Sequence, residues 1–151
     1  QPGSSQADLL STQQFVSCDY PRKYGCLGGT PAQALAFARD TSIRLASTYP
    51  YASYAGHQPP PACRFRASAS AGDGLNTVSG YRTVRKGDED AMMSALQQAP
   101  LAVGIDADSF EFMHYRSGVL DAPACGRDLN HAVLIVGHGV ASDGTPYWRI
   151  K

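Results

Sequence analysis

The sequence predicts an α+β fold, with helices mainly in the first half of the chain and strands in the second. Three segments with helix-start signals precede Pro100, and short apolar runs follow it at residues 101–105 and 132–136. Fifteen Gly and ten Pro favour a loop-rich protein over a helical bundle. We therefore expect a helical part over residues 1–81 and a β-barrel-like part over residues 82–151.

Two of the expected helices begin with the capping-box pattern. In this pattern the capping hydroxyl and the third helical residue each bond to the other's backbone N–H. Ser11 with Gln14 has this spacing, and Thr30 with Gln33 repeats it. Pro31 also occupies the first position of the second helix, where proline is favoured.

The third expected helix is capped by Asp88 and ends at Pro100. An apolar side at helical spacing supports it, made of Met92, Ala95, Leu96 and Ala99.

Beyond Pro100 the pattern becomes that of strands. Residues 101–105 and 132–136 are apolar runs bounded by turn residues, which is typical of buried strands. A glycine-rich turn is expected at residues 137–139, followed by a strand at 147–151 that holds the only tryptophan. His131 stands immediately before the second of these strands.

The composition excludes several classes of function. The formal net charge is zero at pH 7, so no basic field favours nucleic acid or an anionic membrane surface. No apolar run approaches the ~18 residues that span a bilayer. The four cysteines have no Cys-x-x-Cys spacing, which argues against zinc and favours structural disulfides in an oxidising compartment. No metal or other cofactor is expected.

Six segments resemble those of one protease family, in the same order and at similar spacing. They are LSTQQFVSCD at 10–19, GCLGGTP at 25–31, YPY at 49–51, AVGIDA at 102–107, FMHYRSGV at 112–119, and LNHAVLIVGHG with YWRIK at 129–151. Together they resemble the papain-like cysteine peptidases. The resemblance implies a two-lobe papain-like fold, incomplete at both ends, with a cleft that binds an extended peptide.

The resemblance also implies the chemistry. In this family a cysteine thiolate attacks the peptide carbonyl, and a histidine pairs with the thiolate and then protonates the leaving amine. His131 fits the role of that histidine. A lone histidine before an apolar strand is more often structural, so the assignment depends on the motifs around it. His138 stands where the family usually has Tyr and is expected to be structural, and His57 and His114 are expected to be solvated.

The substrate contacts implied by the resemblance lie in both of the expected parts of the chain. They are Gly28, Gly29, Thr30, Pro31, Gly104, Leu129 and Asn130. Taken alone, the glycine pair fits a simple turn equally well. The resemblance implies that Gly29 bonds the substrate backbone and that the carbonyl of Asn130 lies opposite. The others are small or apolar, so a hydrophobic side chain is expected at the second residue before the cut.

The family's nucleophile motif is absent from the chain. That motif is Cys-Gly-[Ser/Ala]-Cys-[Trp/Tyr], about 130–150 residues before the histidine, and none of the four cysteines has this context. We expect the nucleophile before Gln1 and the orienting asparagine after Lys151. The 151 residues alone should then be inactive.

The resemblance further implies how the cysteines pair. Cys18 should join Cys63, whereas Cys26 and Cys125 should join cysteines outside this stretch. Missing segments or companion chains are expected to complete the fold. Without them, apolar faces should be bare around Leu35, Phe37 and Val133.

Two functions remain open. The first is an active cysteine peptidase of peptide or protein substrates, in a lysosome or vacuole or secreted. The second is a catalytically dead papain-like domain that serves as a binding or scaffold module. The intact His131 and the Gly28-Gly29 pair favour the first. A serine or metal hydrolase has no support, because neither Gly-x-Ser-x-Gly nor His-Glu-x-x-His occurs.

Overall fold

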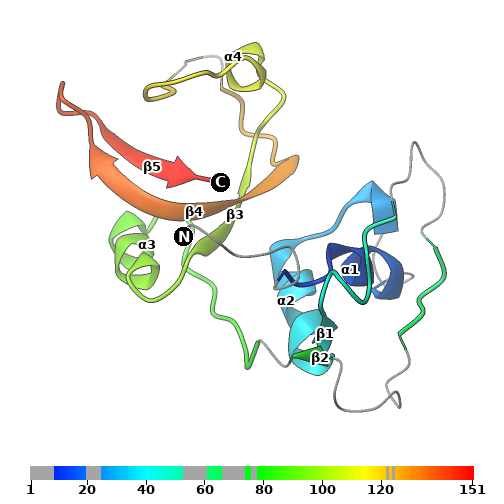
Figure 1. Ribbon diagram of the computed structural model, residues 1–151. Helices are drawn as coiled ribbons and strands as arrows, with labels where there is room; N and C mark the ends of the chain where they lie inside the picture. The colour runs from blue at the N-terminus through cyan, green and yellow to red at the C-terminus, as the bar shows by residue number, and fades with distance from the viewer. Residues whose placement is uncertain are drawn as a thin grey trace. The chain divides into compact units, whose positions relative to one another are not determined.

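The computed structural model describes residues 9–19, 25–52, 61–65, 74–75, 78–121, 123 and 125–151, so His57 lies outside the described part. Its contacts divide the chain into two units, Gln1–Arg82 and Thr83–Lys151. Both units contain helices and strands (Figure 1). No helix of the described residues is long and apolar enough to cross a membrane.

The first unit is mainly helical. It contains α1 (Thr12–Cys18), the short 3-10 helix η2 (Gly25–Leu27), α2 (Pro31–Asp40), β1 (Ile43–Arg44) and β2 (Gly74–Leu75). The two strands pair antiparallel, and an isolated bridge joins Leu10 to Leu45. The bridge lies just before the start of α1.

Helix α1 begins after Ser11 as expected, but its capping box is only half formed. The Ser11 hydroxyl accepts from the N–H of Gln14 at 3.1 Å. The N–H of Ser11 donates to the carbonyl of Arg44 at 2.8 Å instead of to Gln14. The Gln14 amide is therefore free to cross to the β1 segment, where Nε2 donates to the Ser42 carbonyl at 2.9 Å and Oε1 accepts from the Arg44 N–H at 2.8 Å.

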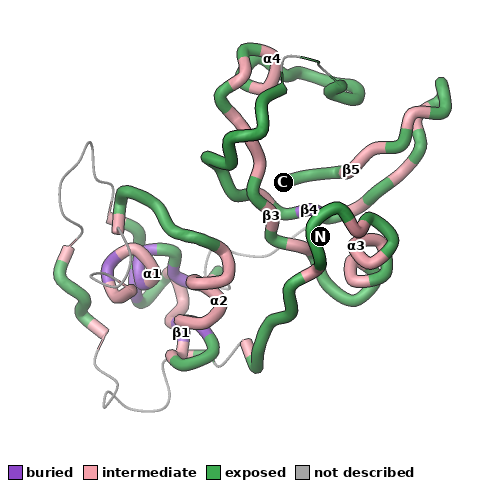
Figure 2. The backbone as a smooth tube through the Cα atoms, turned by 180° about the vertical axis from the view of Figure 1, so that it is seen from behind, coloured by how far each residue is buried: buried purple, intermediate pink, exposed green. Residues whose placement is uncertain are grey.

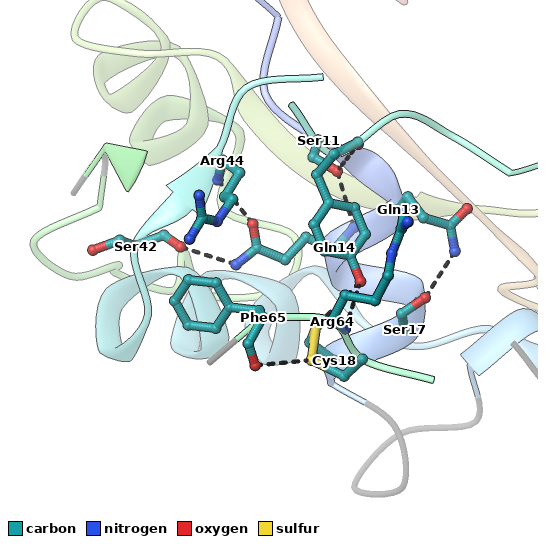
Figure 3. Close-up of a disulfide and its surroundings, with 11 residues drawn as sticks. Ser11, Gln13, Gln14, Ser17, Cys18, Ser42, Arg44, Arg64 and Phe65 are labelled. Carbon is teal, nitrogen blue, oxygen red and sulfur yellow. Dashed lines mark hydrogen bonds between the residues drawn. A yellow bond between two sulfur atoms is a disulfide. The ribbon is translucent and has the colours of Figure 1, made fainter. Parts of the chain in front are cut away.

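Hydrogen bonds from buried polar side chains hold α1 in place (Figure 3). Gln13 donates to the Ser17 hydroxyl at 2.9 Å and accepts from the N–H of Ala52 at 2.9 Å. The Ser11 hydroxyl donates to the carbonyl of Tyr49 at 2.7 Å. Gln13 and Ser11 are 1% exposed and Gln14 is fully buried, so these bonds satisfy groups that water does not reach.

A disulfide closes the same region. Cys18, the last residue of α1, is joined to Cys63, which is the pairing that the family resemblance implied (Figure 3). Because it closes a loop with a sequence separation of 45, it restricts the unfolded chain by about 4 kcal/mol in the entropic account. The Tyr49 hydroxyl accepts from the N–H of Arg64 at 3.2 Å, beside the disulfide.

Helix α2 begins with the complete capping box that its sequence predicted. The Thr30 N–H donates to Gln33 Oε1 at 3.1 Å, and the Gln33 N–H donates to the Thr30 hydroxyl at 3.4 Å. The helix is anchored by Phe37, whose ring meets Phe15 of α1 edge-on at 5.5 Å. Among the described residues of this unit, the buried apolar ones are few, namely Ala38, Ile43 and Tyr49.

The second unit is an antiparallel sheet with α3 packed on it (Figure 1). Its elements are α3 (Glu89–Leu96), β3 (Leu101–Ile105), α4 (Phe110–Met113), β4 (His131–Val140) and β5 (Pro146–Ile150). The strand order is β3-β4-β5. The described strands form an open sheet rather than the closed barrel that the term β-barrel-like suggests.

Helix α3 is shorter than expected. Asp88 caps it by accepting from the N–H of Ala91 at 3.0 Å, as predicted. The helix ends at Leu96, and Ala99 lies in the turn beyond it. The physical reason is Pro100, because a residue before proline is pushed out of the helical region.

The glycines at 137 and 139 do not form the expected turn. Strand β4 continues through them to Val140, with a register irregularity between Ile135 and Gly137. A Cβ at Gly139 would lie 2.8 Å from Cζ of Tyr147, so the glycine leaves room for that ring across the ladder. The turn lies later, at residues 141–145, where the Ala141 N–H donates to the Thr145 carbonyl at 2.8 Å.

The prediction of buried strands is also wrong. Burial alternates along β3 and β4 (Figure 2). Ile135, at 4% exposure, is the only residue of the two strands that is buried. In the observed register Leu101 faces Ile135 and Val103 faces Val133, so the more buried residues share one face. Helix α3 supplies a partner for one face only.

The bare apolar residues are not the ones expected. Leu35, Phe37 and Val133 are half-buried, because α1 packs against Phe37 and β3 pairs with β4. The exposed large apolar residues of the second unit lie elsewhere, at Phe110, Met113, Leu129, Leu134, Val136, Val140 and Ile150, among others. An apolar surface of this extent is typical of a face that another segment or a partner covers.

Replacing Gln14 by Met in the intact protein should lower the free energy of unfolding by about 1–3 kcal/mol. The substitution keeps the volume but removes the hydrogen bonds that the buried Gln14 amide makes to the Ser42 carbonyl and to the Arg44 N–H. Gln33→Met, which disturbs only an exposed helix start, should cost under about 1 kcal/mol. Urea unfolding measures both, and equal losses would contradict the role given to Gln14.

Gly139→Ala should destabilise the protein by about 1–3 kcal/mol, because the Tyr147 ring must leave its place on the ladder. The matched control is Gly137→Ala, where a Cβ would lie 3.7 Å from that of Arg149. This control should be neutral or slightly stabilising, since alanine loses less entropy than glycine in a strand. Thermal unfolding of the two variants separates the cases, and a neutral Gly139→Ala would show that the ring moves without cost.

Candidate active site

His131 is the first residue of β4, as the sequence predicted. Its backbone lies opposite Ile105, the last residue of β3, and its side chain is exposed. The neighbouring N–H of Asn130 donates to the carbonyl of Ile105 at 3.0 Å, which extends the ladder by one step. The imidazole is therefore carried at the start of the central strand, where the backbone is paired with β3 on one side.

A carboxylate and an amide tie the end of β3 to the segment before His131. Asp106 Oδ2 accepts from the N–H of Asp128 at 2.9 Å, and its Oδ1 accepts from Asn130 Nδ2 at 3.3 Å. Asn130 Oδ1 accepts in turn from the N–H of Ala107 at 2.9 Å. The local sequence gives no signal for Asp106, because its partners Asp128 and Asn130 are 22 and 24 residues away along the chain.

These hydrogen bonds favour the ionised form of Asp106. The N–H groups of Asp128 and then Asp108 donate to the carboxylate and lower its pKa below the usual value, with a smaller contribution from Asn130. Partial desolvation acts in the opposite direction and is outweighed. The carboxylate is therefore a stable acceptor at neutral and mildly acidic pH.

Small and apolar residues occupy the more exposed face of β3 and β4. Gly104 lies opposite Ala132 in the register, and both are exposed. The side chain of Leu129 covers this spot, since a Cβ on Gly104 would lie 3.3 Å from Leu129 Cδ1. Ala132 is not singled out by the sequence, because its place beside Gly104 follows from the register of the two strands.

The other expected contacts belong to the first unit. Gly28 follows η2 with φ of 118°, a backbone conformation that favours glycine, and Gly29 precedes the cap of α2. Thr30 and Pro31 are committed to the helix start described above. The structure thus brings Gly104, Leu129, Asn130 and His131 together in one unit and Gly28 to Pro31 together in the other.

The remaining histidines and cysteines are distinct from this cluster. His138 meets the Trp148 ring edge-on at 6.0 Å, and His114 stacks on Phe110 at 4.0 Å. Cys26 and Cys125 are free and exposed. Within the described ranges, no three His, Cys, Asp or Glu side chains are grouped as a metal site would require.

Comparison with known proteins identifies the family. Residues 3–151 match the sequence model described as papain family cysteine protease. The chain belongs to the papain family. Cysteine endopeptidase RepA of Oryza sativa subsp. japonica is 38% identical over 143 residues, covering 94% of this chain and 35% of that protein.

Solved structures agree on the fold. Procathepsin L 3 from the larval midgut of Tenebrio molitor has a TM-score of 0.77 at 37% identity, covering 95% of this chain and 44% of that one. Bromelain from Ananas comosus, solved with the E64 inhibitor, has a TM-score of 0.75 at 33% identity, covering 95% and 61%. The described residues therefore form part of a papain-like α+β fold.

The chain spans only part of its relatives. It covers between 35% and 40% of the length of the curated papain-family proteins that it matches. These relatives include proteins named as cysteine endopeptidases and thiol proteases.

The Asp106 carboxyl should titrate below the ~3.9 of an unperturbed Asp. Because the pKa of Asp106 is lower in the folded than in the unfolded protein, the ionised carboxylate stabilises the fold at pH values above the unfolded-state pKa. This contribution is lost as the pH falls through the folded-state pKa. Carboxyl ¹³C NMR of the folded protein, with the urea-unfolded protein as reference, measures the shift. Identical midpoints in the two states would contradict the hydrogen bonds assigned to Asp106.

Proposed function

We propose that the protein containing this chain is a cysteine endopeptidase that hydrolyses peptide bonds through a thiolate–imidazolium pair, with His131 supplying the imidazole. The observation that carries the proposal is the exposed His131 at the first position of β4, in a chain of the papain family. An exposed ring on a fixed backbone can meet a nucleophile and a substrate without rearranging the sheet.

The imidazole has two tasks in this chemistry. It keeps the cysteine as a thiolate by holding the proton, and it gives that proton to the departing amine when the thioester forms. Water then attacks the thioester and releases the acid product. The nucleophile is a cysteine outside these 151 residues, because none of the four present has the family's signature. An asparagine, also outside them, orients the ring.

The substrate is an extended peptide or protein segment. Gly29, with no side chain to obstruct the approach of another backbone, bonds to the substrate main chain, and the Asn130 carbonyl does so as well. Each unit also contributes small or apolar contacts to the substrate, Thr30 and Pro31 in the first and Gly104 and Leu129 in the second. Ala132 belongs with Gly104 and Leu129, because it lies opposite Gly104 on the same exposed face. Contacts of this composition select a hydrophobic side chain at the second residue before the cut.

The setting is an oxidising compartment, either lysosomal or vacuolar or extracellular. The Cys18–Cys63 disulfide supports this, since such bonds persist where thiols are not kept reduced. Cys26 and Cys125 pair with cysteines of the remaining polypeptide. That polypeptide, or a companion chain, also covers exposed apolar residues such as Leu134 and Val136.

The second candidate is a catalytically dead papain-like domain that only binds its partner. The exposed, small-residue face around Gly104 and Ala132 suits peptide binding with or without cleavage. Reaction of the intact protein with E64, the inhibitor present in the bromelain structure, separates the two. An active nucleophile is consumed stoichiometrically, whereas a dead domain leaves the inhibitor unreacted.

His131→Ala in the intact protein should lower peptide turnover by about 1,000-fold or more, since the thiolate loses its partner and the amine its proton donor. The free energy of unfolding should change by no more than about 0.5 kcal/mol, because the side chain is exposed. The control is His138→Phe, which removes an imidazole from the same strand and keeps an aromatic ring beside Trp148.

The measurement is the rate of hydrolysis of a fluorogenic peptide with a hydrophobic second residue, together with urea unfolding. The control should retain most of the activity. Wild-type turnover in His131→Ala would remove this residue from the mechanism.

A further inference from the structure

The role of Asp106 is not explained by the chemistry of the reaction. It follows directly after β3 and is half-buried. Its two carboxylate oxygens accept from the N–H of Asp128, from Asn130 Nδ2 and from the N–H of Asp108, at 2.9, 3.3 and 3.3 Å. All three donors belong to the protein itself, so this carboxylate is directed at the chain rather than at a ligand.

The donors from Asp128 and Asn130 flank Leu129. The Asn130 side chain makes a second bond to the same region, because its Oδ1 accepts from the N–H of Ala107 at 2.9 Å. The segment that enters β4 is thus tied twice to the residues that leave β3. The Leu129 side chain is in turn held over Gly104.

Gly126 supports the same arrangement. A Cβ at this position would overlap the carboxylate of Asp106, so only glycine leaves room for the carboxylate to reach the Asp128 N–H. This requirement accounts for a glycine at a position without a left-handed φ. It also provides a way to displace the carboxylate without changing it.

We propose that Asp106 is a positioning residue for substrate binding, which holds Leu129 and Asn130 in the extended conformation that receives the peptide. The inference rests on the proposed function, in which Leu129 and Asn130 contact the substrate. His131 itself is fixed by its pairing in the β3–β4 ladder, which the Asn130 N–H extends by one bond to Ile105, whereas residues 126–129 lie outside the strand and are exposed. Asp106 therefore acts on binding rather than on the chemical step.

The physical consequence is a population effect. Without the carboxylate, residues 126–130 sample conformations in which Leu129 and Asn130 are not in the extended arrangement that receives the peptide. The apparent affinity then falls by the fraction of molecules that remain competent. If about a tenth remain competent, KM rises about 10-fold while the rate of the bound complex is nearly unchanged.

The test uses Asp106→Asn and Gly126→Ala in the intact protein. Asparagine keeps the shape, but its NH2 group faces either the Asp128 N–H or the Asn130 amide, which are themselves donors. Gly126→Ala leaves the carboxylate chemically unaltered and displaces it. The matched control, Asp108→Asn, removes the same charge two residues away and keeps its backbone N–H. Active sites are counted with E64, and KM and kcat are measured on the same peptide.

We expect both test variants to raise KM about 10-fold with kcat per active site within about 3-fold, and the control to stay within about 2-fold of wild type. A fall in the number of active sites at unchanged KM would overturn the proposal, because that is the signature of a purely structural role. An unchanged KM in Asp106→Asn would overturn it as well.

A second measurement separates this inference from the proposed function. The NMR signals of the Asp128 N–H and the Asn130 side-chain amide should shift in both test variants and not in Asp108→Asn. If the wild type reacts with neither peptide nor E64, the peptidase assignment fails, and these signals still decide whether Asp106 holds the segment. Unshifted signals in an active enzyme would overturn the positioning role alone.

Discussion

The antiparallel pairing of β3 with β4 is the constraint on which the second unit depends. It sets Ile105 against His131 and Gly104 against Ala132, and so decides which side chains are half-buried and which are exposed. A slip of one residue would exchange the two faces of β4. The side-chain bonds of Asp106 and Asn130 lie just beyond the last pair and extend the same register toward Leu129.

The first unit is stabilised in a different way. Its described part has few fully buried apolar side chains, while Gln13 and Gln14 are buried almost completely. Each glutamine satisfies backbone groups on another segment, which a methionine of the same size would not do. Such bonds have a fixed geometry, so they specify where α1 lies relative to β1. The Cys18–Cys63 disulfide adds a covalent limit at the end of the same helix.

The candidate site combines a fixed histidine with a segment that is ordered by polar contacts. His131 takes its position from the strand ladder, whereas the carboxylate of Asp106 holds the Asn130 side chain and the Asp128 N–H on either side of Leu129. Small residues matter at the same place for steric reasons. Gly104 leaves room for the Leu129 side chain, and Gly126 leaves room for the Asp106 carboxylate. The histidine and the neighbouring residues proposed to bind the substrate are thus held by different interactions.

The sequence by itself determined the features that depend on neighbours along the chain or on a whole motif. The helix starts at Ser11, Thr30 and Asp88, the strand at 101–105 and the papain family all follow from it, because caps and motifs are local. Only the tertiary structure decided the long-range partners of Gln14 and Asp106 and the requirement for glycine at 139. The two partners of Gln14 are 28 and 30 residues away along the chain, and those of Asp106 across the sheet are 22 and 24 residues away. Gly139 makes room for a tyrosine ring 8 residues further on, and a local pattern carries no information about such distances in space.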